Sequence, residues 1–304
     1  MTALVSKSGH ATGPRPLHAP YAGRAKPFTI GLAPLGDLPW FEVDARRDGE
    51  LAQKAAIFAA EPGAFMAEDG TEVVQQVVLA RLERHLSEHG LLPATVPTIE
   101  GAAPLVRAAL LVQDDLIIMR EGPEGYRLVA AALCFPSAWS LAEKFGRPMD
   151  EIHTIVPGWK GRMAERVARI FDHLAADAPV WRLNWSLQLG EALRRPRPKH
   201  ADTPGPDAAA FDEAALFVRV ERQTLTRLSE TGDILFTIKV MLDPLQALAT
   251  HPDGVRLLSA LRDEVVALTP DQLAYKGLVA SRDRVVEMID VRAAALAPVA
   301  AAPR

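Results

Sequence analysis

The sequence predicts an α+β fold, in which an antiparallel sheet of about five strands carries a helical crossover on one face and helices at both ends. Three observations predict it. Two short apolar runs, residues 115–120 and 126–135, flank a Gly-Pro-Glu-Gly hairpin signal at residues 122–125. Residues 181–189 alternate between apolar and polar side chains, which is the period of a half-buried strand. Helical patterns precede, separate and follow these strands.

The other elements follow from the same periodicities. We expect helices at residues 50–60, 72–88, 139–146, 160–176, 244–250, 254–267 and 271–295, the last broken by Gly277, and further strands at residues 214–228 and 234–241. The second of these helices stops before Gly90, and glycine is a common residue just past a helix C-terminus. Two antiparallel strand groups separated by a helical crossover resemble the roughly five-stranded PAS sheet, whose helical segment closes a ligand pocket over one face.

Length and composition indicate one domain between two tails. The chain has 304 residues, of which 49% are hydrophobic and 24% charged, as in an ordinary globular protein. Residues 1–48 are rich in Pro and Gly and are expected to form a tail or a wrap. Residues 49–290 are expected to form a single domain with helical flanks, and residues 291–304 an Ala/Pro-rich tail.

Charge and hydropathy argue against two classes of partner. The net charge is −4 and no long basic block occurs, so we expect no nucleic acid, because phosphate binding needs clustered Lys and Arg. No run approaches the roughly 18 apolar residues of a membrane span, so we expect no membrane partner. The N-terminal residues lack the apolar stretch of a signal peptide. These features predict a cytoplasmic protein.

The single cysteine, Cys134, limits the redox chemistry. One thiol excludes an intramolecular disulfide and a Cys-rich zinc site, and an iron–sulfur cluster usually needs four thiolates. The sequence also has neither a Gly-x-Gly-x-x-Gly turn nor a Gly-x-x-x-x-Gly-Lys loop, so it lacks the usual backbone cradles for nucleotides. If the protein handles electrons, another polypeptide delivers them.

Histidines are the first candidate ligands, since neutral imidazole commonly binds haem and metals. His85 and His89 lie four residues apart on one expected helix and can face one metal, but a helix C-terminus also favours cations. His153 lies in the crossover that would cover the pocket. Taken alone, it is either a ligand or a packed loop histidine.

Polar residues on the expected strands are the next candidates. Strict alternation places Arg222 on one face with an apolar row, where a buried guanidinium needs an anion. It serves a pocket there, or it pairs with an acid such as Glu230. Arg219 and Glu221 share the opposite face and can pair across a strand register or with Lys239.

Asn184 and Cys134 complete the candidates. Asn184 belongs to its polar row, which faces either water or a polar pocket beside the aromatic residues Trp181 and Trp185. Cys134 ends an apolar strand, where a buried thiol is usually inert, and a thiolate–haem bond is the alternative.

Four blocks of the sequence resemble a known family. The first is Leu-Cys-Phe-Pro-Ser-Ala-Trp-Ser-Leu-Ala-Glu-Lys at residues 133–144, followed by Gly146-Arg147-Pro148, Ile152-His153 and Val156-Pro157-Gly158. The second is Arg182-Leu183-Asn184-Trp185. The third is Arg-Val-Glu-Arg-Gln-Thr-Leu-x-Arg-Leu at residues 219–228, with Thr231-Gly232 and Ile-Leu-Phe-Thr-Ile at residues 234–238. The fourth is Tyr275-Lys276-Gly277. Together they resemble the haem-binding alpha-type subunit of the haem-dependent oxidative N-demethylases.

The resemblance implies a PAS-like haem-binding domain over residues 49–290 and a definite chemistry. A b-type haem would oxidise a small secondary amine such as dimethylamine with dioxygen, as a monooxygenase, and release formaldehyde. Electrons would come from NADPH through reductase partner subunits that carry flavin and an iron–sulfur cluster. By position, the resemblance implies that His153 is the axial iron ligand and that Asn184 and Trp185 lie at the cofactor. It implies that Arg222, Arg219 and Glu221 present polar groups to bound oxygen or amine.

Two rival functions remain open from the sequence. A non-catalytic haem or small-ligand sensor of the PAS type would bind haem without amine-dependent consumption of NADPH. A structural or assembly subunit would stay colourless after haem is supplied. No attached kinase or DNA-binding helix-turn-helix is evident, which favours the enzyme over the sensor.

Overall fold

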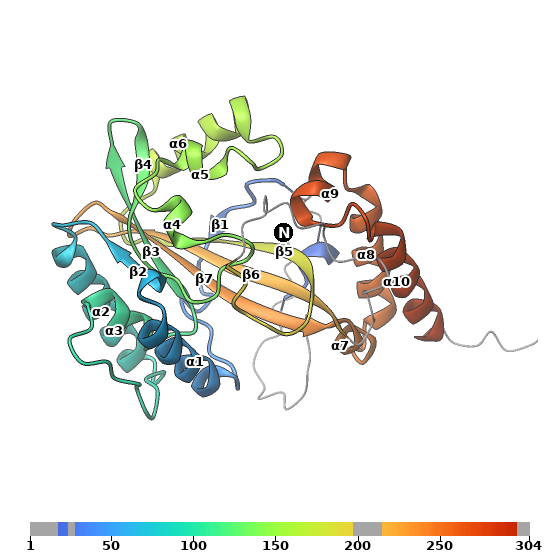
Figure 1. Cartoon of the computed structure of the whole chain (residues 1–304), viewed down its shortest axis with the longest axis horizontal. Coiled ribbons are helices and arrows are strands. Elements are labelled where there is room, and N and C mark those ends of the chain that lie inside the picture. Colours follow the sequence, from blue (N-terminus) through green and yellow to red (C-terminus); the bar gives the residue numbers. More distant parts are fainter. Residues whose placement is uncertain (1–17, 24–27, 197–214, 297–304) are drawn as a thin grey trace, which may run out of the picture.

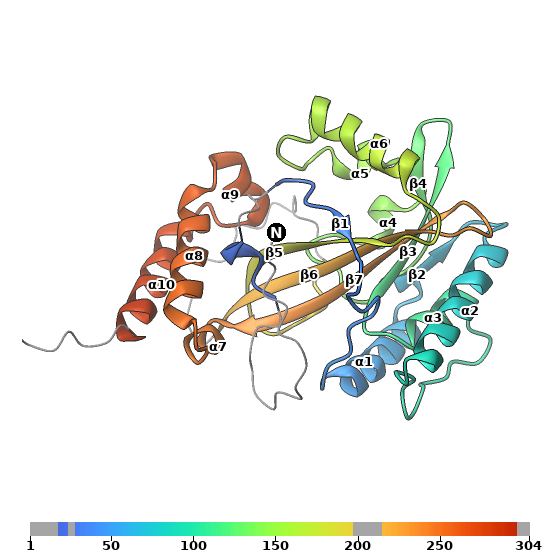
Figure 2. The same cartoon turned by 180° about the vertical axis from the view of Figure 1, so that it is seen from behind.

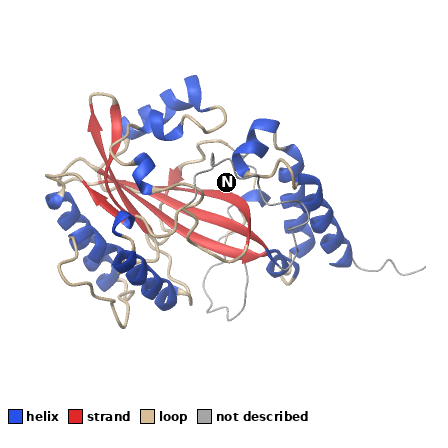
Figure 3. Cartoon of the chain, in the orientation of Figure 1, coloured by secondary structure: helices blue, strands red, loops and turns tan. Residues whose placement is uncertain are grey.

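A computed structural model describes residues 18–23, 28–196 and 215–296, and it contains one mixed arrangement of sheet and helices (Figure 1). The strands are β1 (Ala33–Pro34), β2 (Phe65–Ala67), β3 (Asp115–Gly122), β4 (Gly125–Ala132), β5 (Val180–Leu189), β6 (Leu216–Arg227) and β7 (Ile234–Pro244). They form one sheet in the order β1-β5-β6-β7-β3-β4-β2, and every neighbouring pair is antiparallel. Figure 3 shows this sheet surrounded by helices.

The helices account for most of the remaining described chain. They are α1 (Arg47–Ala60), α2 (Glu72–Glu88), α3 (Pro104–Ala109), α4 (Leu141–Lys144), α5 (Met149–His153), α6 (Ala164–His173), α7 (Leu245–Ala249), α8 (Gly254–Ala267), α9 (Pro270–Lys276) and α10 (Arg282–Leu296). A π-helical turn, Trp159–Met163, leads into α6. Within the described residues, no helix combines the length and the apolar character needed to cross a membrane.

The α+β class is confirmed, but the expected number of about five strands is wrong. The five long strands lie where the periodicities predict them, and the two additional strands, β1 and β2, contain only two and three residues. Such short strands cannot display a two-residue alternation. β1 lies inside the expected N-terminal tail or wrap, where Ala33 and Pro34 pair with Trp181 and Val180 of β5.

Local signals in the sequence explain how several elements begin and end. Gly125 has φ +88° at the turn between β3 and β4, a conformation that glycine adopts without a Cβ penalty. Helix α9 begins with a capping box, in which Thr269 and Gln272 satisfy each other's backbone amides. It ends at Gly277, which has a left-handed conformation. The expected break at Gly277 is thus confirmed, and α10 follows it.

The sheet separates two differently covered faces. Leu225, Val240 and Leu242 face the crossover, where Met149 and Trp159 pack in the same apolar cluster. On the other face, α2 and α3 cover the strands at one end of the sheet, and α7, α8 and α10 cover them at the other. Figures 1 and 2 show these two groups of helices at opposite ends of the molecule.

A buried polar cluster lies between these two groups of helices. Lys239 of β7 is fully buried, and its ammonium contacts the Asp44 carboxylate at 3.1 Å and donates to the Glu42 carbonyl at 2.7 Å. Lys54 of α1 is also fully buried and donates to the backbone carbonyls of Val112 and Asp114. The Asp114 side chain is fully buried, and neither carboxylate oxygen has a hydrogen-bond partner among the described residues.

The Asp114 carboxyl should make stability depend on pH. Burial raises its pKa to about 6, although the nearby charges of Lys239, Arg222 and Lys54 oppose the shift. The folded protein therefore binds a proton between about pH 4 and pH 6 that the unfolded chain releases. The resulting stabilisation is present below about pH 4 and is lost as the pH rises through 6.

The free energy of unfolding of Asp114→Asn, taken relative to that of the parent, should increase by up to roughly 3 kcal/mol as the pH rises from 4 to 8. The free energy of unfolding in urea at both pH values measures this, and subtracting parent from variant cancels the titration of other groups. Asp172→Asn, at an exposed position on α6, is the matched control and should show no such change. A difference in unfolding free energy between parent and variant that does not change with pH would contradict the raised pKa of Asp114.

Candidate functional site

A row of polar side chains lies on the sheet face that the crossover covers. The register of β5 and β6 pairs Asn184 with Glu221 and Arg182 with Gln223. Because side chains alternate along a strand, these residues share a face with Leu225, which packs against the crossover. Three helical segments of the crossover, α4, α5 and α6, lie on this side of the sheet, and this face is polar on β5 and β6 and apolar on β7.

His153 is the last residue of α5 and is held in one orientation. Its Nδ1 donates to the Met149 carbonyl at 2.9 Å, and its ring stacks on Trp159 with centroids 4.4 Å apart and planes 21° apart. A carbonyl only accepts, so Nδ1 carries the proton and Nε2 keeps its lone pair. Burial lowers the pKa of His153 to about 4, and the charges of Lys144 and Arg182 add to the shift. The ring is therefore neutral and held in one orientation, with the Nε2 lone pair available.

Glu221 is the carboxylate of the polar row and is itself held by neighbours. Arg219 Nε lies 3.3 Å from its Oε1, and Gln223 donates to its Oε2 at 3.1 Å. Asn184 also donates to Oε2, at 3.4 Å. Arg219 is 1% exposed, and its other nitrogens donate to the carbonyls of Leu193 and Phe135, at 2.9 and 2.6 Å. Arg219 thus acts mainly as a support that fixes Glu221 against the sheet.

Arg222 lies on the opposite face of the sheet. It is fully buried, and its Nε lies 3.2 Å from Glu42 Oε1. Its other nitrogens donate to the carbonyls of Pro39 and Trp40. The structure therefore does not bring Arg222 to the polar row on the other face. Arg222 does pair with an acid, which is Glu42 rather than Glu230, because Glu230 binds Arg81.

Trp185 lies on the same face as Arg222, away from Asn184. It is 5% exposed and meets Tyr21 edge-on, with ring centroids 6.2 Å apart. The ammonium of Lys276 lies 4.3 Å from the centroid of its ring and donates to its backbone carbonyl at 2.6 Å. Of the two β5 residues expected at the cofactor, only Asn184 shares the covered face with His153.

Two site residues were not expected from the sequence. Lys144 ends α4, and its charge acts on both His153 and Glu221. Tyr275 of α9 lies near Glu221 and Arg182; burial raises its pKa to about 12, the Glu221 charge adds to the shift and Arg182 opposes it. Their only sequence signal is membership of the resembling blocks. No periodicity places α9 next to β5.

The donor set fits a haem. A neutral imidazole with a free Nε2 is a common axial ligand. The Arg182 Nε atom is buried and has no hydrogen-bond partner among the described residues, so it can serve an anionic group. Apolar side chains of Ile152 and Val156 from the crossover and Ile238 from β7 pack in the same cluster and can contact a macrocycle.

Other candidate metal or redox groups are less suitable. His85 and His89 stack with ring centroids 4.2 Å apart, but no set of three His, Cys, Asp or Glu side chains within metal-binding reach occurs in the described part of the chain. Cys134 is fully buried, and burial raises the pKa of its thiol well above the usual range. The thiol is therefore protonated and inert rather than a thiolate ligand.

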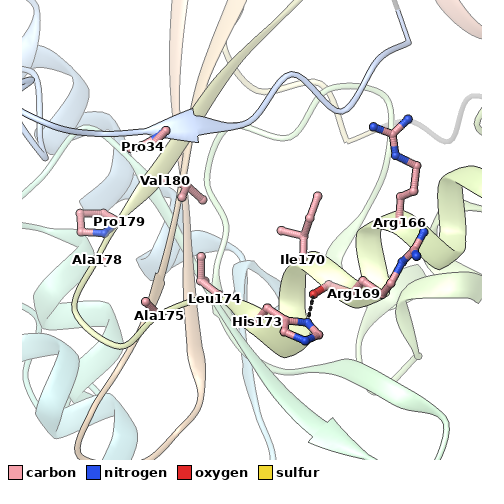
Figure 4. A pocket seen from close by; sticks show the side chains of 10 residues that line it. All are labelled: Pro34, Arg166, Arg169, Ile170, His173, Leu174, Ala175, Ala178, Pro179 and Val180. Carbon is pink, nitrogen blue, oxygen red and sulfur yellow. Dashed lines mark hydrogen bonds between the residues drawn. The ribbon is translucent and has the colours of Figure 1, made fainter.

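A groove of about 620 Å³ lies outside this site, between α6 and the sheet edge. Figure 4 shows Arg166 and Arg169 along its α6 side and Pro34 and Val180 at the strands. The dashed line marks the bond between His173 Nδ1 and the Arg169 carbonyl. None of the expected site residues lines this groove.

Comparison with protein families identifies the relatives of this chain. Residues 62–286 match the family described as haem-dependent oxidative N-demethylase, alpha subunit-like. The matched range includes all the elements that form the site, from α4 through α9. It also contains the resembling blocks quoted from the sequence. The chain therefore belongs to the alpha subunit-like family of the haem-dependent oxidative N-demethylases.

Proposed function

We propose that this protein binds haem b through His153 and oxidises a methyl group of a small secondary amine, such as dimethylamine. The observation that carries the proposal is the neutral, pre-oriented imidazole of His153 in the crossover, on the side of the sheet that carries the Glu221 carboxylate. In this proposal the five long strands and the crossover form a PAS-like core, with the ligand between them.

The overall reaction balances with an external electron donor. One dimethylamine, one dioxygen, two electrons and two protons give one methylamine, one formaldehyde and one water. When bound, haem supplies the iron at which dioxygen is reduced. We infer that the electrons come from NADPH through flavin and iron–sulfur partner subunits, because this chain has one cysteine and lacks the common nucleotide-binding fingerprints. Membership of an alpha subunit-like family supports a multi-subunit assembly.

The residues of this chain bind and orient the amine. At neutral pH a small secondary amine is a cation, and Glu221 can accept its N–H bonds as a charge-assisted pair. Arg219, Asn184 and Gln223 hold the carboxylate in place, so little ordering is required when the amine arrives. The apolar residues of β7 and the crossover limit water around the reacting methyl group.

Glu221→Gln should weaken amine binding about 10- to 100-fold and leave haem binding unchanged, because a charged hydrogen bond contributes about 1.5–3 kcal/mol. Titration of dimethylamine into the haem-loaded protein, followed by the visible spectrum, measures this. Glu165→Gln, at an exposed position on α6, is the matched control and should leave amine binding unchanged. Equal amine affinity in Glu221→Gln and the parent would remove Glu221 from the site.

The activity itself is tested with a surrogate electron donor. Haem-loaded protein is mixed with dimethylamine, dioxygen, NADPH and a ferredoxin with its reductase, and formaldehyde is quantified. We expect formaldehyde in equal amount to the amine consumed. If the haem spectrum does not respond to amine and no formaldehyde is released, a haem or small-ligand sensor would be favoured instead.

A further inference from the structure

The turn before α6 and the helix itself carry a cationic surface. Residues 159–173 contain four lysine or arginine residues and two carboxylates, all of them exposed: Lys160, Arg162, Arg166, Arg169, Glu165 and Asp172. None of the six forms an ion pair with the described residues, and the flanking ion pairs, Arg147 with Glu151 and Arg81 with Asp177, do not include them. The stretch therefore has an excess of positive charge, although the whole chain has a net charge of −4.

Three of these cations lie along one face of the helix and form an arginine stripe. Arg162, Arg166 and Arg169 are spaced by four and three residues, which places their side chains one above another. On the opposite side, Val167 and Phe171 pack in the apolar cluster of the crossover. Like charges at this spacing destabilise a helix, and the helix dipole disfavours cations near its N-terminus, where Arg162 and Arg166 lie. The stability of α6 therefore does not account for the stripe.

The groove of about 620 Å³ runs beside the arginine stripe. Arg166 and Arg169 border it, and none of its described lining residues is a carboxylate (Figure 4). Apolar side chains form most of the lining, among them Ile170, Leu174 and Val180. An apolar hollow with a charged rim is the usual anatomy of a protein–protein interface. The surface therefore fits a partner that presents carboxylates around an apolar side chain.

The arginine stripe begins close to the proposed iron ligand. His153 stacks on Trp159 with ring centroids 4.4 Å apart, and Trp159 opens the turn that leads into α6. Arg162 follows Trp159 by three residues, so their Cα atoms are at most about 11 Å apart. A protein bound to the stripe would therefore lie beside the segment that carries His153.

We propose that the arginine stripe and its groove bind an acidic surface of the partner subunit that donates electrons. The inference rests on the proposed function, because it takes an external iron–sulfur donor. Each reduced cluster passes one electron to the haem iron and is itself oxidised, so two encounters supply the two electrons of the reaction. Opposite charges speed such encounters and orient the donor. A nucleic acid is less suitable, because the chain as a whole is acidic and the groove is apolar.

An acidic plant-type ferredoxin is the probe, and calorimetry at low salt gives its dissociation constant with the haem-free protein. The double variant Arg166→Gln, Arg169→Gln should bind it at least about tenfold more weakly than the parent. The matched control, Arg84→Gln, Arg107→Gln, removes two exposed arginines from α2 and α3 on the other face of the sheet, and it should bind as the parent does. Added salt should bring the parent close to the stripe variant.

The haem-loaded protein provides a second readout. The second-order rate constant for haem reduction by pre-reduced ferredoxin should fall by a similar factor in the stripe variant and stay unchanged in the control. Reduction by dithionite at high salt should be equal in all three proteins, because a small reductant does not need the stripe. This measurement shows that the haem site is intact in each variant.

Equal ferredoxin affinity in the stripe variant and the control, or no binding by the parent, would overturn the inference. A short DNA duplex that binds the parent more tightly than ferredoxin does, and loses affinity in the stripe variant, would overturn it in favour of a nucleic acid. Equal rates of formaldehyde release by all three proteins at limiting ferredoxin would overturn the inference alone. Stripe-dependent ferredoxin binding without formaldehyde release would support the binding surface and contradict the proposed function.

Discussion

Arg222→Ala should lower the free energy of unfolding by roughly 3–5 kcal/mol and leave the haem affinity of the folded protein unchanged. The reason is its position on the sheet face away from His153. The guanidinium is fully buried against Glu42 and the carbonyls of Pro39 and Trp40. Its removal leaves two carbonyls without their donor and the Glu42 carboxylate without its guanidinium partner, although His18 still bonds that carboxylate. It also releases the N-terminal segment from β6.

Urea unfolding of the haem-free protein measures this effect. Arg256→Ala is the matched control, since Arg256 pairs with Asp253 at a half-exposed site on α8 and should cost less than about 1 kcal/mol. The double variant Arg222→Ala, Glu42→Gln should cost less than the sum of the two single changes, because the two side chains are in contact. A cost below about 1 kcal/mol for Arg222→Ala would show that this pair does not hold the N-terminal segment.

The strands and their faces were predictable because they depend on local periodicity. The alternation over residues 181–189 predicts β5, which spans Val180–Leu189, and it correctly places Asn184 and Trp185 on opposite faces. The same rule separates Arg222 from Arg219 and Glu221. The sequence therefore contained the information on which side chains share a face.

Which segments pack against each face of the sheet was not predictable, because this depends on contacts between distant parts of the sequence. Arg222 meets Glu42, which comes from the N-terminal segment that was expected to form a tail or a wrap. Lys239 meets Asp44 of the same segment, rather than Glu221. Tyr275 reaches β5 only because α9 folds back over the sheet. No pattern within one strand specifies such partners.

The placement of His153 was predictable only in part. Its place in the crossover follows from the order of the elements, but its helix does not, since α5 contains only five residues. His173 and His89 make the same bond from Nδ1 to the carbonyl four residues earlier, at 2.8 Å each. The bond alone therefore marks a histidine at a helix C-terminus. The stacking on Trp159 distinguishes His153 from these two.

His153→Ala should weaken haem binding at least about 100-fold, because it removes the only ligand atom that we propose for the iron. The Met149 carbonyl and Trp159 would remain in place, so the fold should survive the change. His173→Ala is the matched control, since His173 ends α6 with the same backbone bond but is exposed. It should bind haem as the parent does.

The visible spectrum of the haem-supplemented protein, recorded for the parent, His153→Ala and His173→Ala, tests the central claim most directly. We expect a Soret band in the parent and in His173→Ala that vanishes or shifts in His153→Ala. An unchanged band in His153→Ala would show that the haem is bound elsewhere. No band in the parent would contradict the haem-dependent function itself.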